Sequence, residues 1–109
     1  MTSCTKNYIL INFTTSYNKL VQMKDILSLS EDYIDETYRE IGKNVKKIRM
    51  EKGVSQLKLA QAIGHKSVSI VSLAEICHNK QHFNIEHLVK IAYVLDVDIC
   101  EFFPKNFYE

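Results

Sequence analysis

The sequence has few of the residues that interrupt helices. Its 109 residues include only three glycines and one proline, and tryptophan is absent. Turns and irregular loops depend on glycine and proline, so their scarcity favours a mostly helical chain. With 46% hydrophobic residues, the chain can still bury an ordinary small core. Its length predicts one compact domain with an appendage.

Other absences exclude whole classes of protein. The apolar runs are far too short to span a bilayer, and residues 8–13 are too short and poorly flanked for a signal peptide. We therefore expect a cytoplasmic protein with no membrane partner. Cys4, Cys77 and Cys100 are odd in number and widely spaced, which predicts reduced thiols. Without a Gly-rich phosphate loop, an evident carboxylate pair or a nucleophile triad, we expect no enzyme, no catalytic residue and no cofactor.

The net charge of +1 hides a strong asymmetry along the chain. Residues 43–66 hold seven Lys or Arg and one Glu, whereas residues 1–42 and 96–109 are net acidic. Such a basic block is the electrostatic footprint of a phosphate-binding surface. The alternative is a solvated, lysine-rich helix face. We favour the footprint because the block coincides with the helical pattern described next.

Apolar residues recur every three or four positions from Ser30 onward. Ser30 is a plausible N-cap for a first helix that runs unbroken to Glu51 or breaks near Gly42. Four shorter helices are predicted after it. They begin at Ser55, at Ser67 or Ser69, at Asn84 and at Asp98, and they end at Gly64, near Ile76, at Leu95 and before Pro104.

The first thirty residues are less regular. Residues 8–13 predict a short strand and residues 17–29 a short amphipathic helix. Because a lone strand needs a partner, we interpret residues 1–38 as an N-terminal extension that dimerises the protein. The alternative is that its apolar side chains fold back onto the main domain, residues 39–109.

Residues 41–103 resemble the lambda-repressor-like family, also called the Cro/CI or Xre type. The matching positions are Arg49, Val54-Ser55-Gln56, Leu59-Ala60, Gly64, Glu75 and the run from Leu88 to Leu95. The resemblance implies an all-α, five-helix domain with a helix-turn-helix. It also implies a sequence-specific transcriptional regulator, most simply a repressor. The third helix would enter the major groove of double-stranded DNA, and the protein would act as a homodimer.

The resemblance assigns roles to particular residues. Gln56 would reach a phosphate and brace the third helix, and Lys66, Ser67 and Lys80 would contact further phosphates. The expected base-facing residues are Val68, Ser69 and Ser72, with Leu73 as a further candidate. Serine suits several bases and valine only a thymine methyl group, so shape readout and water-mediated contacts are further sources of specificity.

Two alternatives stay open at this point. Glu75 should pair with Arg49 across the core, but a shifted register would place Cys77 there and strand the arginine. The serines of the third helix distinguish bases poorly, so the second alternative is a protein-interaction module, such as an antitoxin-like partner-binding protein with weak or no DNA binding. A metal site at Cys77, His78, His82 and His87 is not expected, because their spacing matches no known zinc finger.

Overall fold

The structure, a computed structural model, describes residues 22–106. Its contacts divide the chain into two units, Met1–Ser30 and Glu31–Glu109. The described part of the first unit contains one 3-10 turn, η1 (Ile26–Ser28). The helix predicted over residues 17–29 is therefore wrong for its described part, because the Asp25 carboxylate accepts a hydrogen bond from the Leu27 N–H at 3.0 Å and forms a local turn instead. The predicted strand, residues 8–13, lies outside the described residues.

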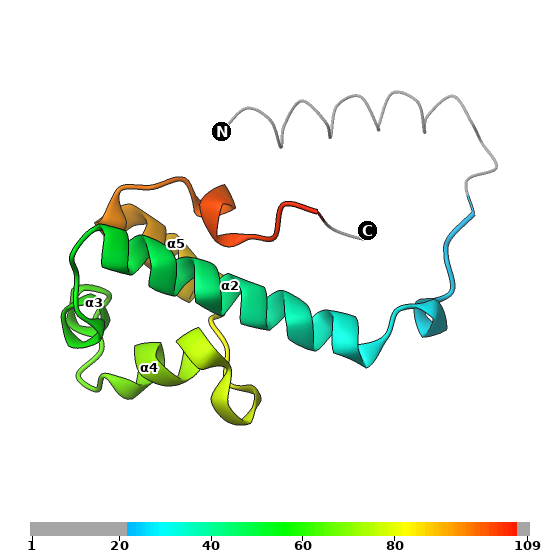
Figure 1. Ribbon diagram of the computed structural model, residues 1–109, viewed down its shortest axis with the longest axis horizontal. Coiled ribbons are helices and arrows are strands. Elements are labelled where there is room, and N and C mark those ends of the chain that lie inside the picture. The colour runs from blue at the N-terminus through cyan, green and yellow to red at the C-terminus, as the bar shows by residue number, and fades with distance from the viewer. Residues whose placement is uncertain (1–21, 107–109) are drawn as a thin grey trace. The chain divides into compact units, whose positions relative to one another are not determined.

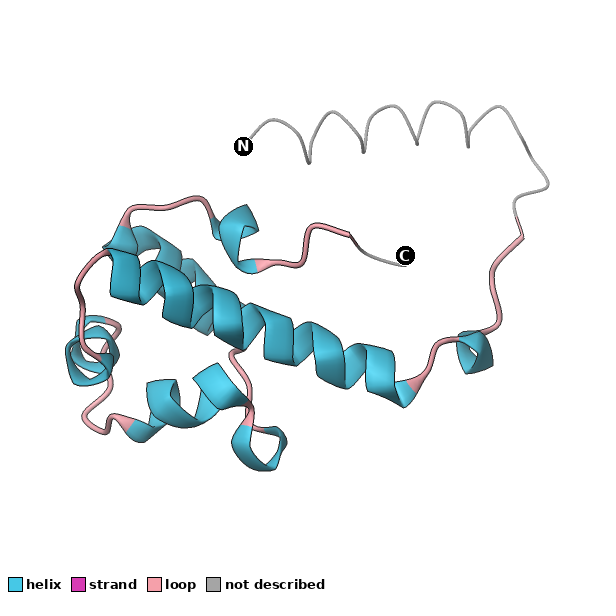
Figure 2. Ribbon diagram, in the orientation of Figure 1, coloured by secondary structure: helices cyan, strands magenta, loops and turns pink. Residues whose placement is uncertain are grey.

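The second unit is built from α-helices, as Figures 1 and 2 show. They are α2 (Glu31–Glu51), α3 (Gln56–Ala62), α4 (Ser69–Ile76) and α5 (Ile85–Leu95), with 3-10 turns η2 (His78–Lys80) and η3 (Ile99–Phe102). The described residues contain no strand, so the predicted all-α class is confirmed there. A fifth α-helix is not: the segment after Asp98 is the turn η3, in which the Asp98 side chain accepts from the Cys100 N–H at 2.9 Å.

Side-chain caps and left-handed residues set the helix ends. Ser55 accepts from the Lys58 N–H at 3.1 Å and so caps α3. Asn84 and His87 form a reciprocal capping box at the start of α5. Gly53 and Gly64 have φ values of +71° and +96°, so both turns use the left-handed backbone that glycine allows.

Helix α2 runs unbroken through Gly42, which has a packing role. A Cβ atom at Gly42 would lie 2.6 Å from the carbonyl oxygens of both Ala74 and Glu75. The main chains of α2 and α4 therefore touch. Glycine inside a helix costs about 0.5–1 kcal/mol relative to alanine, and here it permits a close approach that no other residue allows.

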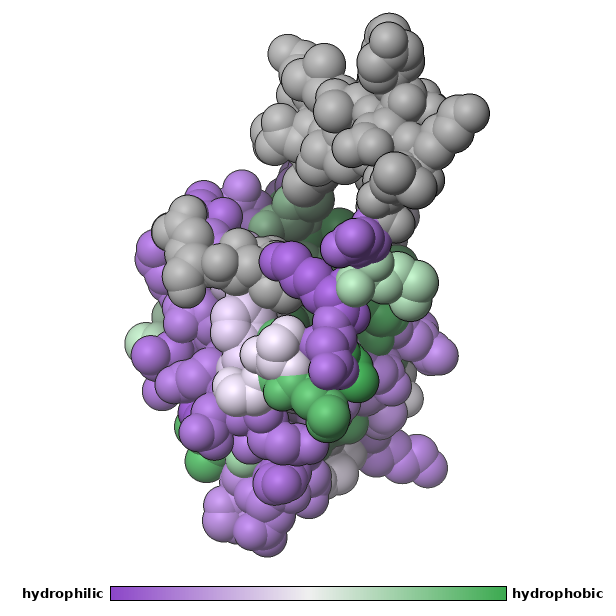
Figure 3. Space-filling model, turned by 90° about the vertical axis from the view of Figure 1, so that its right-hand side faces the viewer, coloured by the Kyte–Doolittle hydropathy of each residue, from purple (hydrophilic) through white to green (hydrophobic). Residues whose placement is uncertain are grey.

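The core lies where α2, α3, α4, α5 and η3 meet. Its fully buried members include Val45, Leu59, Val71, Ile91 and Phe102. Outside it, hydrophilic side chains cover most of the surface coloured in Figure 3, and hydrophobic ones gather in a smaller area.

Helix α2 separates α4 from the C-terminal segment. The Asn44 Nδ2 donates to the Phe102 carbonyl oxygen at 3.0 Å, which ties η3 to α2. Gly42 and Asn44 are two residues apart and so face opposite sides of the helix. Accordingly, α4 and η3 lie on different sides of α2 (Figure 1).

Candidate nucleic-acid interface

Helices α3 and α4 are joined by a tight connection. The Gly64 N–H donates to the Gln61 carbonyl and the His65 N–H to the Ala60 carbonyl, at 3.0 and 2.9 Å. These bonds satisfy the last carbonyls of α3 while the left-handed Gly64 reverses the chain. Helix α4 then starts after Val68, and the Ser67 Oγ accepts from the Ser69 N–H at 3.2 Å. Neither Ser67 nor Ser69 is the N-cap of α4. That position is Val68, which makes no side-chain capping hydrogen bond, so this part of the prediction is wrong.

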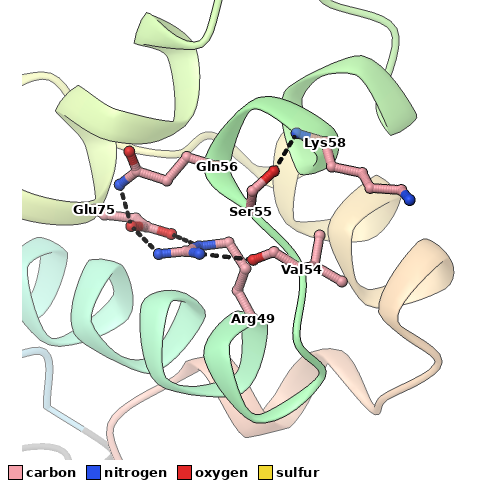
Figure 4. Close-up of polar contacts among 6 residues, drawn as sticks. All are labelled: Arg49, Val54, Ser55, Gln56, Lys58 and Glu75. Carbon is pink, nitrogen blue, oxygen red and sulfur yellow. Dashed lines mark hydrogen bonds and ion pairs between the residues drawn. The ribbon is translucent and has the colours of Figure 1, made fainter.

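A buried ion pair fixes α4 from beneath (Figure 4). The Arg49 Nε donates to the Glu75 Oε2 at 2.7 Å, and its Nη2 donates to the Oε1 at 3.1 Å. The Gln56 Nε2 also donates to the Oε1, at 2.8 Å. The Arg49 Nη1 donates to the Val54 carbonyl at 2.7 Å. One carboxylate thus ties together α2, α3 and α4.

Both members of this pair are buried. The Arg49 and Glu75 side chains are 8% and 0% exposed. A buried charge is costly unless its hydrogen bonds are made, and in the described residues every buried side-chain nitrogen and oxygen has a partner. The structure thus brings Arg49 to Glu75 rather than to Cys77. Cys77 is half-buried at the end of α4, and burial raises the pKa of its thiol, which disfavours the reactive thiolate.

One side of α4 faces solvent. We call Val68, Ser69, Ser72 and Leu73 the α4 outer face. Val68 and Ser69 are exposed, and Ser72 and Leu73 are half-buried. The intervening Val71, Ala74 and Glu75 are buried. The charged member of α4 is therefore turned inward, and the outer face carries only hydroxyl and aliphatic groups.

Two exposed lysines flank α4. Lys66 lies in the turn before it and Lys80 in η2 after it. In that second loop Cys77, Asn79 and Lys80 have φ values of 53°, 51° and 63°. Left-handed non-glycine residues cost of order 1–3 kcal/mol each, so the position of Lys80 is held at a cost in backbone strain.

An aromatic stack that the sequence did not suggest anchors this loop to α2. The rings of Tyr38 and His82 are stacked with centroids 3.6 Å apart and planes 10° apart. Both side chains line a surface cavity together with Cys77, Arg39 and Lys80. Nothing in the spacing of Tyr38 and His82 along the sequence signals this contact.

The basic block of residues 43–66 does not form one patch. Arg49 is neutralised by Glu75. Lys47 lines a cavity with Glu40, Glu51 and Glu101 on the η3 side of α2. The cations next to α4 in the chain are Lys66, which belongs to the block, and Lys80, which does not. Fewer cations of this block are therefore available to a phosphate-binding surface beside α4 than the charge count suggested.

The fold and this interface define a helix-turn-helix protein. A family model described as helix-turn-helix matches residues 45–102, just over half of the chain. The protein belongs to this family, the Cro/CI or Xre type of DNA-binding regulator. No curated protein sequence matches the chain.

No helix in the described part of the chain is long and apolar enough to cross a membrane. No group of three or more His, Cys, Asp and Glu side chains among residues 22–106 is arranged to hold a metal ion.

Proposed function

We propose that this protein is a transcriptional repressor that binds specific sites on duplex DNA as a homodimer, with α4 in the major groove. The observation that carries the proposal is the α4 outer face: it is open to solvent, free of acidic groups and flanked by Lys66 and Lys80. A transcriptional repressor must reach the DNA inside the cell, which agrees with the cytoplasmic location expected from the sequence.

The residues divide into two groups in this proposal. Lys66, Ser67, Lys80 and Gln56 contact phosphates and set the register of the domain on the duplex. Gln56 serves a second purpose, because one N–H of its amide already donates to Glu75. The other N–H of that amide is the one that reaches a phosphate. Val68, Ser69 and Ser72 contact base edges.

Salt dependence tests the DNA-binding step. If about five phosphates are neutralised, the logarithm of the affinity should fall against the logarithm of salt with a slope of roughly −4 to −5. Lys66→Gln and Lys80→Gln should each make this slope less negative by about 1, because each removes one phosphate contact. Lys47→Gln is the matched control, because Lys47 lies beside carboxylates on the η3 side of α2. A flat salt response, or an equal effect of Lys47→Gln, contradicts the proposal.

The homodimer is supported by the geometry of DNA recognition. One module of this size covers one half-site, and dimers of this class bind half-sites about one helical turn apart. Within the N-terminal extension, residues 1–38, we assign the dimer contact to the part that precedes Glu31. Light scattering should give a dimer for the full chain and a monomer for a chain that starts at Glu31, the first residue of the second unit. A monomeric full chain at micromolar concentration, or a shortened chain that still dimerises, contradicts this assignment.

A protein-interaction module is the second candidate. Ile76, at the end of α4, is 61% exposed, and it adds an aliphatic side chain about one helical turn after Leu73. Exposed apolar groups of this kind suit a protein partner. Retention on random duplex DNA at low salt separates the two candidates, since an interaction module should not be retained.

A further inference from the structure

The α4 outer face lacks the side chains that usually identify bases. Arginine and lysine recognise guanine, and asparagine and glutamine recognise adenine, through paired hydrogen bonds in the major groove. Val68, Ser69, Ser72 and Leu73 can make none of these paired contacts. Glu75 is also removed from the interface, because it is buried against Arg49. No carboxylate of α4 is therefore presented to a cytosine amine.

The hydroxyl groups at the start of α4 are partly engaged within the protein. The Ser67 and Ser69 Oγ atoms lie 2.8 Å apart and share a hydrogen bond. The Ser67 Oγ also accepts from the Ser69 N–H. A hydroxyl can donate or accept, so a serine that reaches a base edge distinguishes the bases poorly. Hydrogen bonds from these serines cannot carry most of the specificity.

The aliphatic members of the face remain. Val68 is 37% exposed and lies at the N-terminal end of α4, the end that approaches the bases in this motif. Leu73 is half-buried and lies one turn after Ser69 on the same side. The apolar group that base pairs present in the major groove is the C5-methyl of thymine. An aliphatic side chain docked there gains only by covering that group.

We propose, on the basis of the function proposed above, that Val68 and Leu73 recognise thymine methyl groups. The binding site then carries thymines opposite residues 68–73, and recognition depends on the 5-methyl group of pyrimidines rather than on paired hydrogen bonds. Lys66 and Lys80 contribute affinity without sequence preference, because they contact phosphates.

Replacing thymine with deoxyuridine isolates the methyl group. The full chain first selects its binding sites from a library of random duplexes. Each thymine of the tightest site is then replaced, one at a time, by deoxyuridine, which pairs in the same way but has no 5-methyl group. Burial of one methyl-sized group predicts about fourfold weaker binding at each contacted thymine. At the same positions 5-methylcytosine should bind more tightly than cytosine.

Substitution of the protein assigns the contact. With Val68→Ala, the effect of deoxyuridine should disappear at one thymine and persist at the others. Val89→Ala is the matched control, since Val89 is a valine of α5 that is 53% exposed and lies outside the α4 outer face. The measurements on the unsubstituted protein do not depend on either variant being folded.

The outcomes separate this inference from the function on which it rests. Salt-dependent, sequence-selective binding that changes less than twofold with every deoxyuridine overturns the methyl contact and leaves the regulator intact. Selected sites without thymine overturn it as well. A protein that binds no duplex in a salt-dependent way overturns both.

Discussion

Removing the carboxylate of Glu75 should strongly destabilise the domain, because this group connects α4 to α2 and α3. Glu75→Ala leaves the Arg49 guanidinium buried without its partner and takes the acceptor from Gln56. Loss of one member of a buried ion pair costs about 3–5 kcal/mol. A domain of this size has a free energy of unfolding of roughly 4–12 kcal/mol. The substitution therefore removes a large part of the stability.

Thermal and urea unfolding of the full chain measure this loss. A cost of about 3 kcal/mol should lower the Tm by roughly 12–24 °C. Glu36→Ala is the matched control, because the Arg39–Glu36 pair, 3.2 Å apart, is 50% and 69% exposed. Exposed pairs contribute about 0–1 kcal/mol, so this control should hardly move the midpoint.

A double substitution distinguishes a stranded charge from lost packing. Replacing both partners, as in Arg49→Met with Glu75→Leu, leaves no buried charge and should recover much of the stability. The double variant should therefore be more stable than Glu75→Ala alone. The reasoning is wrong if Glu75→Ala and Glu36→Ala lower the midpoint equally. It is also wrong if the loss of stability in the double variant equals the sum of the losses caused by Arg49→Met and Glu75→Leu separately.

Three further substitutions test other contacts. Gly42→Ala should destabilise by about 1–3 kcal/mol because its Cβ would meet two carbonyl oxygens of α4, whereas Lys43→Ala, at an exposed neighbour, should leave the melting midpoint unchanged. Burial, followed by the nearby charge of His65, lowers the pKa of His87 below its usual value of about 6.5. The unfolded chain then binds the proton first, so stability is complete above about pH 6.5 and falls as the pH drops through that range towards the folded pKa. His87→Gln keeps a side-chain acceptor and should lose less stability between pH 7 and 5 in urea titrations; equal losses count against this role. Tyr38→Leu removes the stack on His82 and should cost about 1 kcal/mol in thermal melts, while Tyr38→Phe should not; an unchanged Tyr38→Leu midpoint shows that the stack contributes little.

Local signals in the sequence predicted most helix ends correctly. Ser55 and Asn84 cap the helices they were expected to cap, and Gly64, where a helix was expected to end, closes the turn after α3 with a left-handed backbone. These features depend on a few neighbouring residues, so a single sequence contains the information. The expectation that Glu75 rather than Cys77 faces Arg49 came from a different argument, the cost of a buried unpaired charge.

Features that depend on contacts distant in the chain were missed. Gly42 reads as a possible break in α2, and only the position of α4 reveals a packing contact. The stack of Tyr38 on His82 joins two elements with no periodic relation. One local feature was missed as well: His87 takes the place that glutamate or glutamine normally holds in a capping box, because its neutral Nδ1 accepts from the Asn84 N–H. The DNA contacts of Gln56, Lys66 and Lys80 remain predictions.

The contact at Gly42 also affects the entropy and heat-capacity changes expected for the proposed binding to DNA. The main chain of α2 lies against the last carbonyls of α4, and Arg49 and Gln56 hold Glu75 from two other elements. Helix α4 is therefore held in its position by the rest of the domain, and the docking proposed above should cost little conformational entropy. The heat-capacity change on binding should then follow the apolar surface that is covered, without the additional contribution of a helix that folds on contact.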